Sequence, residues 1–467
     1  MKLPAYPRTK PSGVEWLGDV PGHWAVKRLK YSASINDEAL PETTSPDFEF
    51  EYVDIGGVSA VDGITATEQV VFENAPSRAR RKVRHGDTIV STVRTYLRAI
   101  APIKNPPENL IVSTGFAVVR PRKVESSFLA YALRESSFVE SVVARSVGVS
   151  YPAVNASEVG GIAIPLPDPA EQQAIAAFLD RETGRVDRLV AKKRELIERL
   201  KEKRTALISR TVTRGLPPAA ARAAGLPENP PLKSSSLEWL GDIPMHWEVM
   251  RFRRLIIRLD QGWSPNANNY PAAPAELGVL KLGAASKGKF YPEDNKALDE
   301  IPEGVIPITP SCGDLLISRA NTPDLVGDAC VVNGDHPNRI IPDLLYRLRL
   351  RPDTNGDYVC WFLLSRSGRA QIECDARGSS GSMVKLGQGH VRAWTIPFPP
   401  LPEQAAIAAY LDLETAKLDA LVGKVEEAVE RLQEYRTALI TAAVTGKIDV
   451  RGSVDVRPGK KVTSASP

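Results

Sequence analysis

The sequence predicts an α+β protein in which one unit, a mixed α/β domain followed by a long helix, occurs twice. Two observations support this prediction. The segment EWLGDVPGHW (Glu15–Trp24) returns as EWLGDIPMHW (Glu238–Trp247), with eight of ten residues identical. The 50 residues that start at Ile164 align without a gap with those that start at Ile396, and 29 of the 50 are identical. The long period excludes a solenoid, whose repeats are far shorter.

Length and composition limit the class of protein. A chain of 467 residues is long enough for two to four domains. An apolar fraction of 43% and a charged fraction of 25% are typical of soluble globular proteins. The net charge of +4 permits a nucleic-acid partner without arguing for one. We find no apolar run of membrane-spanning length and no signal-peptide core, and we expect a cytoplasmic protein with four reduced cysteines.

The repeated 50-residue segments have the pattern of long helices. Prolines precede each segment, and no further proline follows for about forty residues. Apolar residues recur over five heptads, which favours a coiled-coil seam. The a positions are Leu179, Val186, Lys193, Leu200 and Leu207, and Leu411, Leu418, Val425, Leu432 and Leu439. The d positions are Ile175, Glu182, Leu189, Leu196 and Lys203, and Ile407, Glu414, Leu421, Ala428, Tyr435 and Ala442.

Charge favours pairing between the two helices. Residues Arg185–Arg204 contain nine basic and four acidic side chains, whereas Lys417–Arg436 contain four basic and five acidic. A basic helix and a mildly acidic helix attract each other. The alternative is that each helix packs only on its own domain.

The regions between the repeated segments, about Leu29–Gly161 and Arg251–Ala393, contain short β-like runs separated by Pro, Gly and Asn. Examples are DTIVSTV, FAVVRP, DLLISR, DACVVN and LLYRLRL, and two helical stretches accompany them. Apart from scattered matches such as Gly86-Asp87 and Gly313-Asp314, the two regions have diverged. This pattern is expected if the repeated ends form a common scaffold and the middles bind two different ligands.

Catalytic motifs are missing from the sequence. The two Asn-Pro-Pro runs, at Asn105 and Asn229, lack the aromatic residue of an adenine methyltransferase loop, and no G-x-G-x-x-G occurs. A D-x-K within PEDNK is too short to indicate a nuclease. His23 and His246 each lack nearby ligand partners, so we expect them to pack beside Trp24 and Trp247 rather than bind metal. We therefore predict no catalytic residue and no metal site.

Basic and small polar side chains gather in the two divergent regions. Arginine can bind phosphate or a guanine edge, asparagine can bind adenine, and tyrosine can pack on a sugar or base. Gly/Ser-rich loops allow a close approach to a nucleic-acid backbone. The alternative for each stretch is a solvated charged surface. The candidate DNA-binding residues are Arg78, Arg80, Arg81, Lys82, Arg84, Arg94, Tyr96, Arg98, Arg145, Ser150, Tyr151, Arg319, Asn321, Arg377, Ser379, Ser380, Ser382, Lys385 and Gln388.

The chain resembles the specificity (S) subunit of type I restriction-modification systems over nearly its whole length. The resemblance is carried by EWLGDVPGHW, GDTIVS and GDLLISR, IPLPDPAEQ and IPFPPLPEQ, and RTALISRTVTRG and RTALITAAVTGKIDV. Each motif is weak alone, but all of them occur twice in the same order.

The resemblance implies two mixed α/β target recognition domains, joined by two long helices that form an antiparallel coiled coil, in an internal pseudo-twofold repeat. Each domain would bind one half of a split site in double-stranded DNA. Two modification (methyltransferase) subunits and motor-nuclease restriction subunits would be partners, and S-adenosylmethionine, ATP and magnesium would be bound by them. We divide the chain into a first recognition domain (1–162), a first helical spacer (163–212), a linker (213–236), a second recognition domain (237–394), a second helical spacer (395–447) and a C-terminal tail (448–467).

Two other classes of function remain open. The chain could itself be a fused methyltransferase, which binding of the cofactor to the isolated protein would reveal. It could also be a purely structural coiled-coil protein, which would show no salt-dependent binding to DNA.

Overall fold

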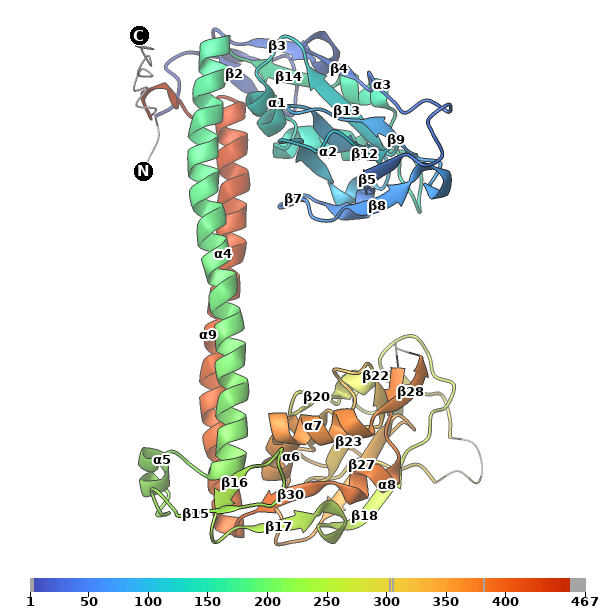
Figure 1. Cartoon of the computed structure of the whole chain (residues 1–467), viewed down its shortest axis with the longest axis vertical. Helices are drawn as coiled ribbons and strands as arrows, with labels where there is room; N and C mark the ends of the chain where they lie inside the picture. The colour runs from blue at the N-terminus through green and yellow to red at the C-terminus, as the bar shows by residue number, and fades with distance from the viewer. Residues whose placement is uncertain (1–3, 302–303, 305, 381–382, 454–467) are drawn as a thin grey trace, which may run out of the picture. The chain divides into compact units, whose positions relative to one another are not determined.

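The computed structural model describes residues 4–301, 304, 306–380 and 383–453 (Figure 1). The chain forms two compact units. The first contains Met1–Arg194 and Glu427–Pro467, and the second contains Glu195–Glu426. Each unit therefore combines one mixed α/β domain with a segment of each long helix.

The domain of the first unit contains two four-stranded sheets. The first has the order β11 (Ile100–Pro102), β10 (Thr88–Ser91), β13 (Phe116–Pro121) and β4 (Ala33–Ile35). The second has the order β8 (Glu68–Val71), β5 (Glu49–Val53), β12 (Leu110–Ser113) and β9 (Ala79–Lys82), with β5 and β12 parallel. Three short helices follow β13: α1 (Ser126–Ala132), α2 (Ser136–Ala144) and α3 (Ala156–Gly161).

The domain of the second unit repeats this topology. Its first sheet has the order β25 (Ala329–Val331), β23 (Leu315–Ser318), β27 (Leu345–Leu350) and β18 (Ile256–Gln261). Its second sheet has the order β22 (Asn295–Ala297), β19 (Gly278–Leu280) and β26 (Arg339–Ile340), with β19 and β26 parallel. The helices are α6 (Gly356–Leu364), α7 (Arg366–Asp375) and α8 (Gln388–Ala393). The runs predicted as strands form β10, β13, β23, β25 and β27, so the sheet order is common to both domains although their sequences have diverged.

The two domains differ in the strands that flank their second sheets. In the first, β9 flanks β12, whereas no strand of the described second unit flanks β26 in this way. The second unit instead has a small sheet of β24 (Ala320–Asn321), β29 (Met383–Lys385) and β28 (Arg377–Ser380). The remaining short strands are β1 (Thr9–Pro11), β2 (Asp19–Pro21), β3 (Ala25–Arg28), β6 (Val58–Ser59), β7 (Gly63–Ile64), β14 (Ala163–Leu166), β15 (Leu232–Ser234), β16 (Asp242–Pro244), β17 (Glu248–Arg251), β20 (Ala285–Ser286), β21 (Lys289–Phe290) and β30 (Thr395–Phe398).

The long helices are α4 (Pro169–Arg214) and α9 (Leu401–Val444). Asp168 caps α4, because its carboxylate accepts a hydrogen bond from the backbone N–H of Glu171 at 2.9 Å, and Pro169 occupies the first helical position, where no N–H is needed. Both predicted helical spacers begin with a strand: β14 pairs with β3, and β30 pairs with β17.

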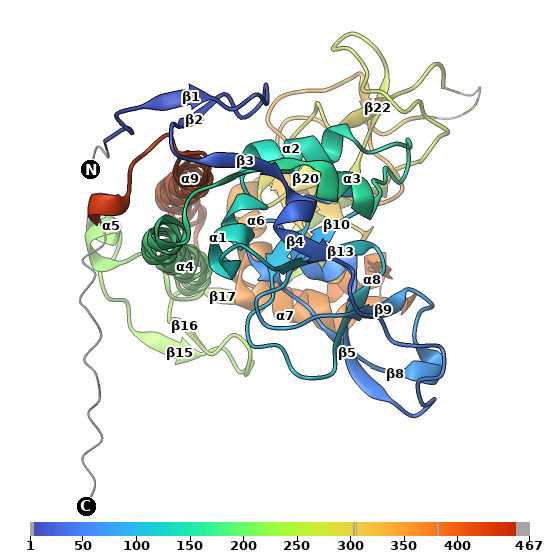
Figure 2. The same cartoon turned by 90° about the horizontal axis from the view of Figure 1, so that it is seen from above.

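Segments of α4 and α9 pack side by side and antiparallel within each unit (Figures 1 and 2). In the first unit, Arg436 of α9 donates to Asp187 of α4 at 2.9 Å. In the second unit, Arg204 of α4 donates to Asp419 of α9 at 3.0 Å. The four residues occupy equivalent places in the two repeats, so one ion pair is made twice. The predicted antiparallel pairing is confirmed.

The predicted a row is buried or half-buried along both helices. The predicted d row is correct at the start of each helix, where Ile175 and Ile407 are fully buried, but it is wrong by one residue farther along. Leu189, Leu196, Leu421 and Tyr435 of that row are 44%, 42%, 44% and 55% exposed. The second buried row lies four residues after each a position and contains Thr183, Val190, Ile197, Thr211, Thr415 and Ala443.

Threonine explains the error in the d row. The hydroxyl of Thr183 donates to the carbonyl of Leu179 at 2.7 Å, and that of Thr415 donates to the carbonyl of Leu411 at 2.6 Å. A hydroxyl that is satisfied by its own helix can be buried at little cost, which leaves the leucines beside it exposed.

The first tryptophan segment anchors the start of α4. Trp24 is fully buried, and its indole N–H donates to Glu171 at 2.9 Å. His23 Nε2 lies 2.8 Å from the same carboxylate, and the hydroxyl of Tyr6 donates to it at 2.7 Å. Burial raises the pKa of Tyr6, so the phenol stays a donor. The prediction that these residues are structural is confirmed.

The second tryptophan segment makes a reduced version of this anchor. His246 Nε2 lies 2.8 Å from Glu403 in the first turn of α9. Trp247 is also fully buried, but its indole N–H has no hydrogen-bond partner in the part of the chain that the structure describes. The two segments are therefore more similar in sequence than in the contacts that they make.

The same segments also receive the ends of the long helices. Gly446, just past α9, has a φ of +72°, and a Cβ there would overlap the ring of Pro21 and lie 3.2 Å from Trp24. Gly215, just past α4, has a φ of +81° and faces Trp247. Glycine suits both positions because it tolerates left-handed backbone and close approach.

The predicted linker and tail are partly folded. Residues 213–236 contain α5 (Pro218–Ala223) and β15, and Leu216 and Ala221 are buried in the second unit. In the tail, Val450 is buried in the first unit, and Ile448 packs against the same cluster. The tail residues 454–467 lie outside the described part of the chain.

Candidate nucleic-acid interface

In the first unit, a turn and a loop come together beyond β10. The turn Thr95–Leu97 lies against the loop 145–153, and the hydroxyls of Thr95 and Ser146 are 2.7 Å apart. The guanidinium of Arg94 lies 5.0 Å from the centre of the Tyr151 ring. The structure thus brings six candidates into one exposed area, which we call the first patch: Arg94, Tyr96, Arg98, Arg145, Ser150 and Tyr151.

Backbone strain marks this turn. Arg94 and Arg98 have φ angles of +50° and +52°, in the left-handed region that side chains other than glycine rarely adopt. Each costs roughly 1–2 kcal/mol. The two strained residues enclose a turn that presents Tyr96 and Leu97 to solvent. Strain and exposed apolar area together indicate a ligand-binding surface.

The basic run 78–84 contains strand β9 and is therefore not one continuous loop. Adjacent side chains on a strand point to opposite faces. Arg80 lies 4.6 Å over the Phe72 ring and is half-buried, and Arg81, the next residue, is half-buried as well. The candidates of this run therefore do not form one cluster.

The start of the run lies close to the first patch. The backbone N–H of Thr114 donates to the carbonyl of Arg78 at 2.7 Å, and that of Thr92 donates to the carbonyl of Gly115 at 2.8 Å. These two hydrogen bonds link the backbone of Arg78, through Thr114 and Gly115, to Thr92, which precedes the turn of the first patch. Its guanidinium is paired with Asp54 at 3.1 Å.

The end of the run belongs to a structural network. Arg84 is paired with Glu38, whose carboxylate also binds Arg120 at 2.7 Å. That hydrogen bond from Arg120 lowers the pKa of Glu38. Arg120 also donates to the buried Asp87 at 2.8 and 2.9 Å. The Gly-Asp landmark before β10 is therefore tied to the neighbouring strand β13, and Arg84 is the outer member of this network.

In the second unit, the candidates gather around the small sheet. Asn321 on β24 pairs with Val384, and Lys385 on β29 pairs with Ala320. The backbone N–H of Leu386 donates to the carbonyl of Arg319 at 2.8 Å. Gln388 begins α8. We define the second patch as Arg319, Asn321, Lys385 and Gln388. The candidates Arg377, Ser379 and Ser380 belong to strand β28, which pairs with β29.

Not every candidate of the second unit is available to bind DNA in the described structure. Arg319 Nη1 lies 3.6 Å from the carboxylate of Asp343 and donates to its carbonyl at 3.2 Å, so this arginine is partly committed within the protein. Ser382 lies outside the described residues.

The sequence analysis missed the most exposed apolar side chains beside the first patch. Val147 and Val149 lie in the loop after α2, next to Gly148, whose φ is +118°. Glycine and proline around them were the available signal for an exposed turn.

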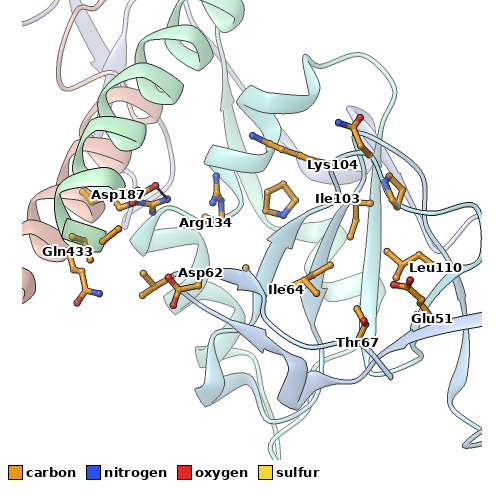
Figure 3. Close-up of a pocket in the computed structure, with 18 of the residues that line it drawn as sticks. Glu51, Asp62, Ile64, Thr67, Ile103, Lys104, Leu110, Arg134, Asp187 and Gln433 are labelled. Atoms are coloured by element: carbon orange, nitrogen blue, oxygen red, sulfur yellow. Dashed lines mark hydrogen bonds and ion pairs between the residues drawn. The ribbon is translucent and has the colours of Figure 1, made fainter. Parts of the chain in front are cut away.

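A separate cavity of about 620 Å³ lies in the first unit between the domain and the long helices (Figure 3). Its charges are largely paired: Arg194 lies 3.7 Å from Asp62, and Arg436 is bound to Asp187. Burial lowers the pKa of Arg134, which also lines the cavity. None of the candidate DNA-binding residues lines it.

The described residues contain no metal-binding cluster, membrane-spanning helix or disulfide. No group of three His, Cys, Asp or Glu side chains there could hold a metal ion. No helix within the described ranges is long and apolar enough to cross a membrane. The four cysteines are free thiols, two buried and two exposed.

Known proteins similar to this chain are specificity subunits of type I restriction enzymes. Residues 48–199 match the type I restriction modification DNA specificity domain. The EcoKI specificity subunit of Escherichia coli K12 is 25% identical over 341 residues, which cover 71% of this chain and 68% of that protein. The MjaVIII specificity subunit of Methanocaldococcus jannaschii is 23% identical over 462 residues, which cover 92% and 94%.

A solved structure from a type I restriction-modification system has the same fold. It is 24% identical, covers 92% of this chain and 99% of its own, and superimposes with a TM-score of 0.67. The repeated landmarks, the shared sheet order and these relatives agree. Over most of its length, the chain is therefore similar to the specificity subunits of type I restriction-modification systems.

Proposed function

We propose that each unit reads one half of a bipartite DNA site, the first unit through the first patch and the second unit through the second patch. The observation that carries this proposal is the contrast between scaffold and surface. Both domains share the strand order of the first sheet and a His–Glu contact at the start of each long helix, but their exposed turns differ in secondary structure. A common scaffold with two different surfaces suits two different half-sites.

The paired helices serve as the spacer between the two half-sites. The repeated Asp–Arg pair supports this role because it holds α4 and α9 in one register in both units. A spacer must keep its length and its rotation, and a register fixed by charge and by buried rows does so.

The helices also dock two modification subunits. The exposed row that contains Leu189 and Tyr435 in the first unit, and Leu196 and Leu421 in the second, supports this part of the proposal. Leu189 and Tyr435 line one hollow of about 550 Å³. Apolar side chains that repeat along an exposed face are typical of protein interfaces.

The chain itself is the non-catalytic member of the complex. S-adenosylmethionine is bound by the modification subunits, and ATP and magnesium by the motor-nuclease restriction subunits. The cavity in Figure 3 supports this division, because two of its acids, Asp62 and Asp187, are held in ion pairs with Arg194 and Arg436.

The proposal is tested by DNA binding and methylation together. The host motif is first found by sequencing methylated adenines. The full chain should then bind a duplex with this motif more tightly than a scrambled duplex, and the affinity should fall steeply between 50 and 200 mM salt, as expected of phosphate contacts. Binding of S-adenosylmethionine by the isolated chain would instead indicate a fused methyltransferase, and salt-independent or absent DNA binding would indicate a structural protein.

A further inference from the structure

The loop that follows α2 exposes apolar side chains to an unusual degree. Val147, Val149 and Tyr151 are 81%, 102% and 65% exposed. Leaving side chains of this size in water forgoes about 1.5–3 kcal/mol of burial for each. Neighbouring exposed apolar residues of this kind mark a contact surface for another molecule.

The base of this loop is held in place. Val147 and Ala153 exchange two backbone hydrogen bonds, of 2.9 and 3.0 Å, and the N–H of Val154 donates to the carbonyl of Thr92 at 2.8 Å. Gly148 allows the turn, since a Cβ there would lie 3.3 Å from the carbonyl of Tyr151. The tip is therefore a small apolar projection on a fixed base.

The surroundings of the tip are basic. Arg94 stacks on the Tyr151 ring, and Arg145 begins the loop. Arg98 lies on the adjoining turn, where it is paired with Glu140. The apolar tip has cations on its flanks. This arrangement suits a two-stranded ligand whose backbones are anionic and which presents a small apolar group between them.

Double-stranded DNA presents such a group at one place. In the major groove, the bases show hydrogen-bonding atoms and one apolar substituent, the C5-methyl group of thymine. The groove is about 12 Å wide and 8.5 Å deep, which admits a two-sided loop. Flanking arginines can then reach the phosphates on either side.

We propose that Val149, with Val147 beside it, reads a thymine in the half-site of the first unit through contact with its C5-methyl group. This inference rests on the proposed function and adds the identity of one base. The flanking arginines contribute affinity, and the valine tip contributes sequence preference.

Single thymines replaced by deoxyuridine test the proposal, because this change removes only the methyl group. The probe is a duplex with the motif methylated in the host, substituted at one thymine at a time. For the wild-type full chain, one substitution should weaken binding about fourfold, as expected for one buried methyl group. In Val149→Ala, binding to the thymine duplex should weaken, and the difference between thymine and deoxyuridine at that position should disappear.

Controls separate the possible failures. Val149→Ile should keep the discrimination, and Val249→Ala, an exposed valine of the second unit, should leave it unchanged. Equal affinities for every thymine and deoxyuridine pair would overturn the proposal while leaving the proposed function intact, since the specific duplex would still be bound. The proposal also fails if Val149→Ala weakens assembly with the modification subunits but keeps the discrimination. Loss of specific binding by the wild type would instead refute the proposed function.

Discussion

Lengthening both helices by one heptad should lengthen the unspecified part of the DNA site. In the second unit, Arg204 faces Asp419. Four residues back along α4 is Leu200, and four residues forward along α9 is Gly423, so these two positions lie opposite each other. Seven residues inserted after Leu200 and seven inserted before Gly423 keep each ion pair on its own side of the insertion.

The size of the effect follows from helix and DNA geometry. Seven residues add about 10 Å to a helix that rises about 1.5 Å per residue. Bases stack at about 3.4 Å, so the spacer should grow by about three base pairs. Three base pairs also rotate the duplex by roughly 100°, since a turn takes about 10.5 base pairs, and the affinity should therefore fall even where the spacing is correct.

Sequencing of methylated adenines is the assay, in cells that contain the variant and its modification partners. We expect the same two half-sites with a longer gap. The matched control inserts seven residues into α4 alone, which breaks the pairing of the helices and should abolish methylation. Methylation by the double insertion at the original spacing alone would show that the helices do not set the gap.

Three further predictions concern single residues. Trp24→Phe should lower the free energy of unfolding by about 1–3 kcal/mol more than Trp247→Phe, because only Trp24 donates a hydrogen bond to a buried carboxylate; equal losses in chemical denaturation would contradict that role. Gly446→Ala should destabilise by at least about 1–2 kcal/mol through its left-handed φ and the overlap with a proline ring, whereas Gly423→Ala, in mid-helix with nothing within 4 Å of the new Cβ, should stabilise by about 1 kcal/mol; thermal unfolding that shifts both variants in one direction would refute this contrast. Arg94→Ala should weaken DNA binding and reduce the slope of log affinity against log salt by about 0.9, the value for one lost phosphate contact, and an unchanged slope would remove this residue from the interface.

Much of the scaffold could be predicted because repetition in the sequence reports on it directly. The tryptophan segments and the long helices recur with few changes, since Trp24 and Glu171 belong to one buried network and leave little freedom for substitution. The Gly-Asp landmarks recur because Asp87 and Asp314 are buried carboxylates that each bind an arginine of the neighbouring strand.

The errors arose where one residue pattern suits two structures. Thr183 is polar and is therefore not expected at a buried heptad position. Its hydroxyl donates to a carbonyl of its own helix, so it is buried, and the predicted seam is one residue away from the observed one. The basic run around Arg81 suggests a solvated loop, but the paired strand β12 makes it a strand. Val149 was not predicted as a site residue, because only the folded loop shows that its side chain faces solvent.

The central claim is that each unit reads its own half of a bipartite DNA site. Sequencing of methylated adenines in cells that express the chain with its modification partners, either as wild type or as Arg94→Ala with Tyr151→Ala, tests it most directly. The wild type should yield two specified segments separated by an unspecified gap, and the double variant should relax or lose the specificity of one segment while the other stays unchanged. A single contiguous motif, or equal relaxation of both segments, would contradict the account.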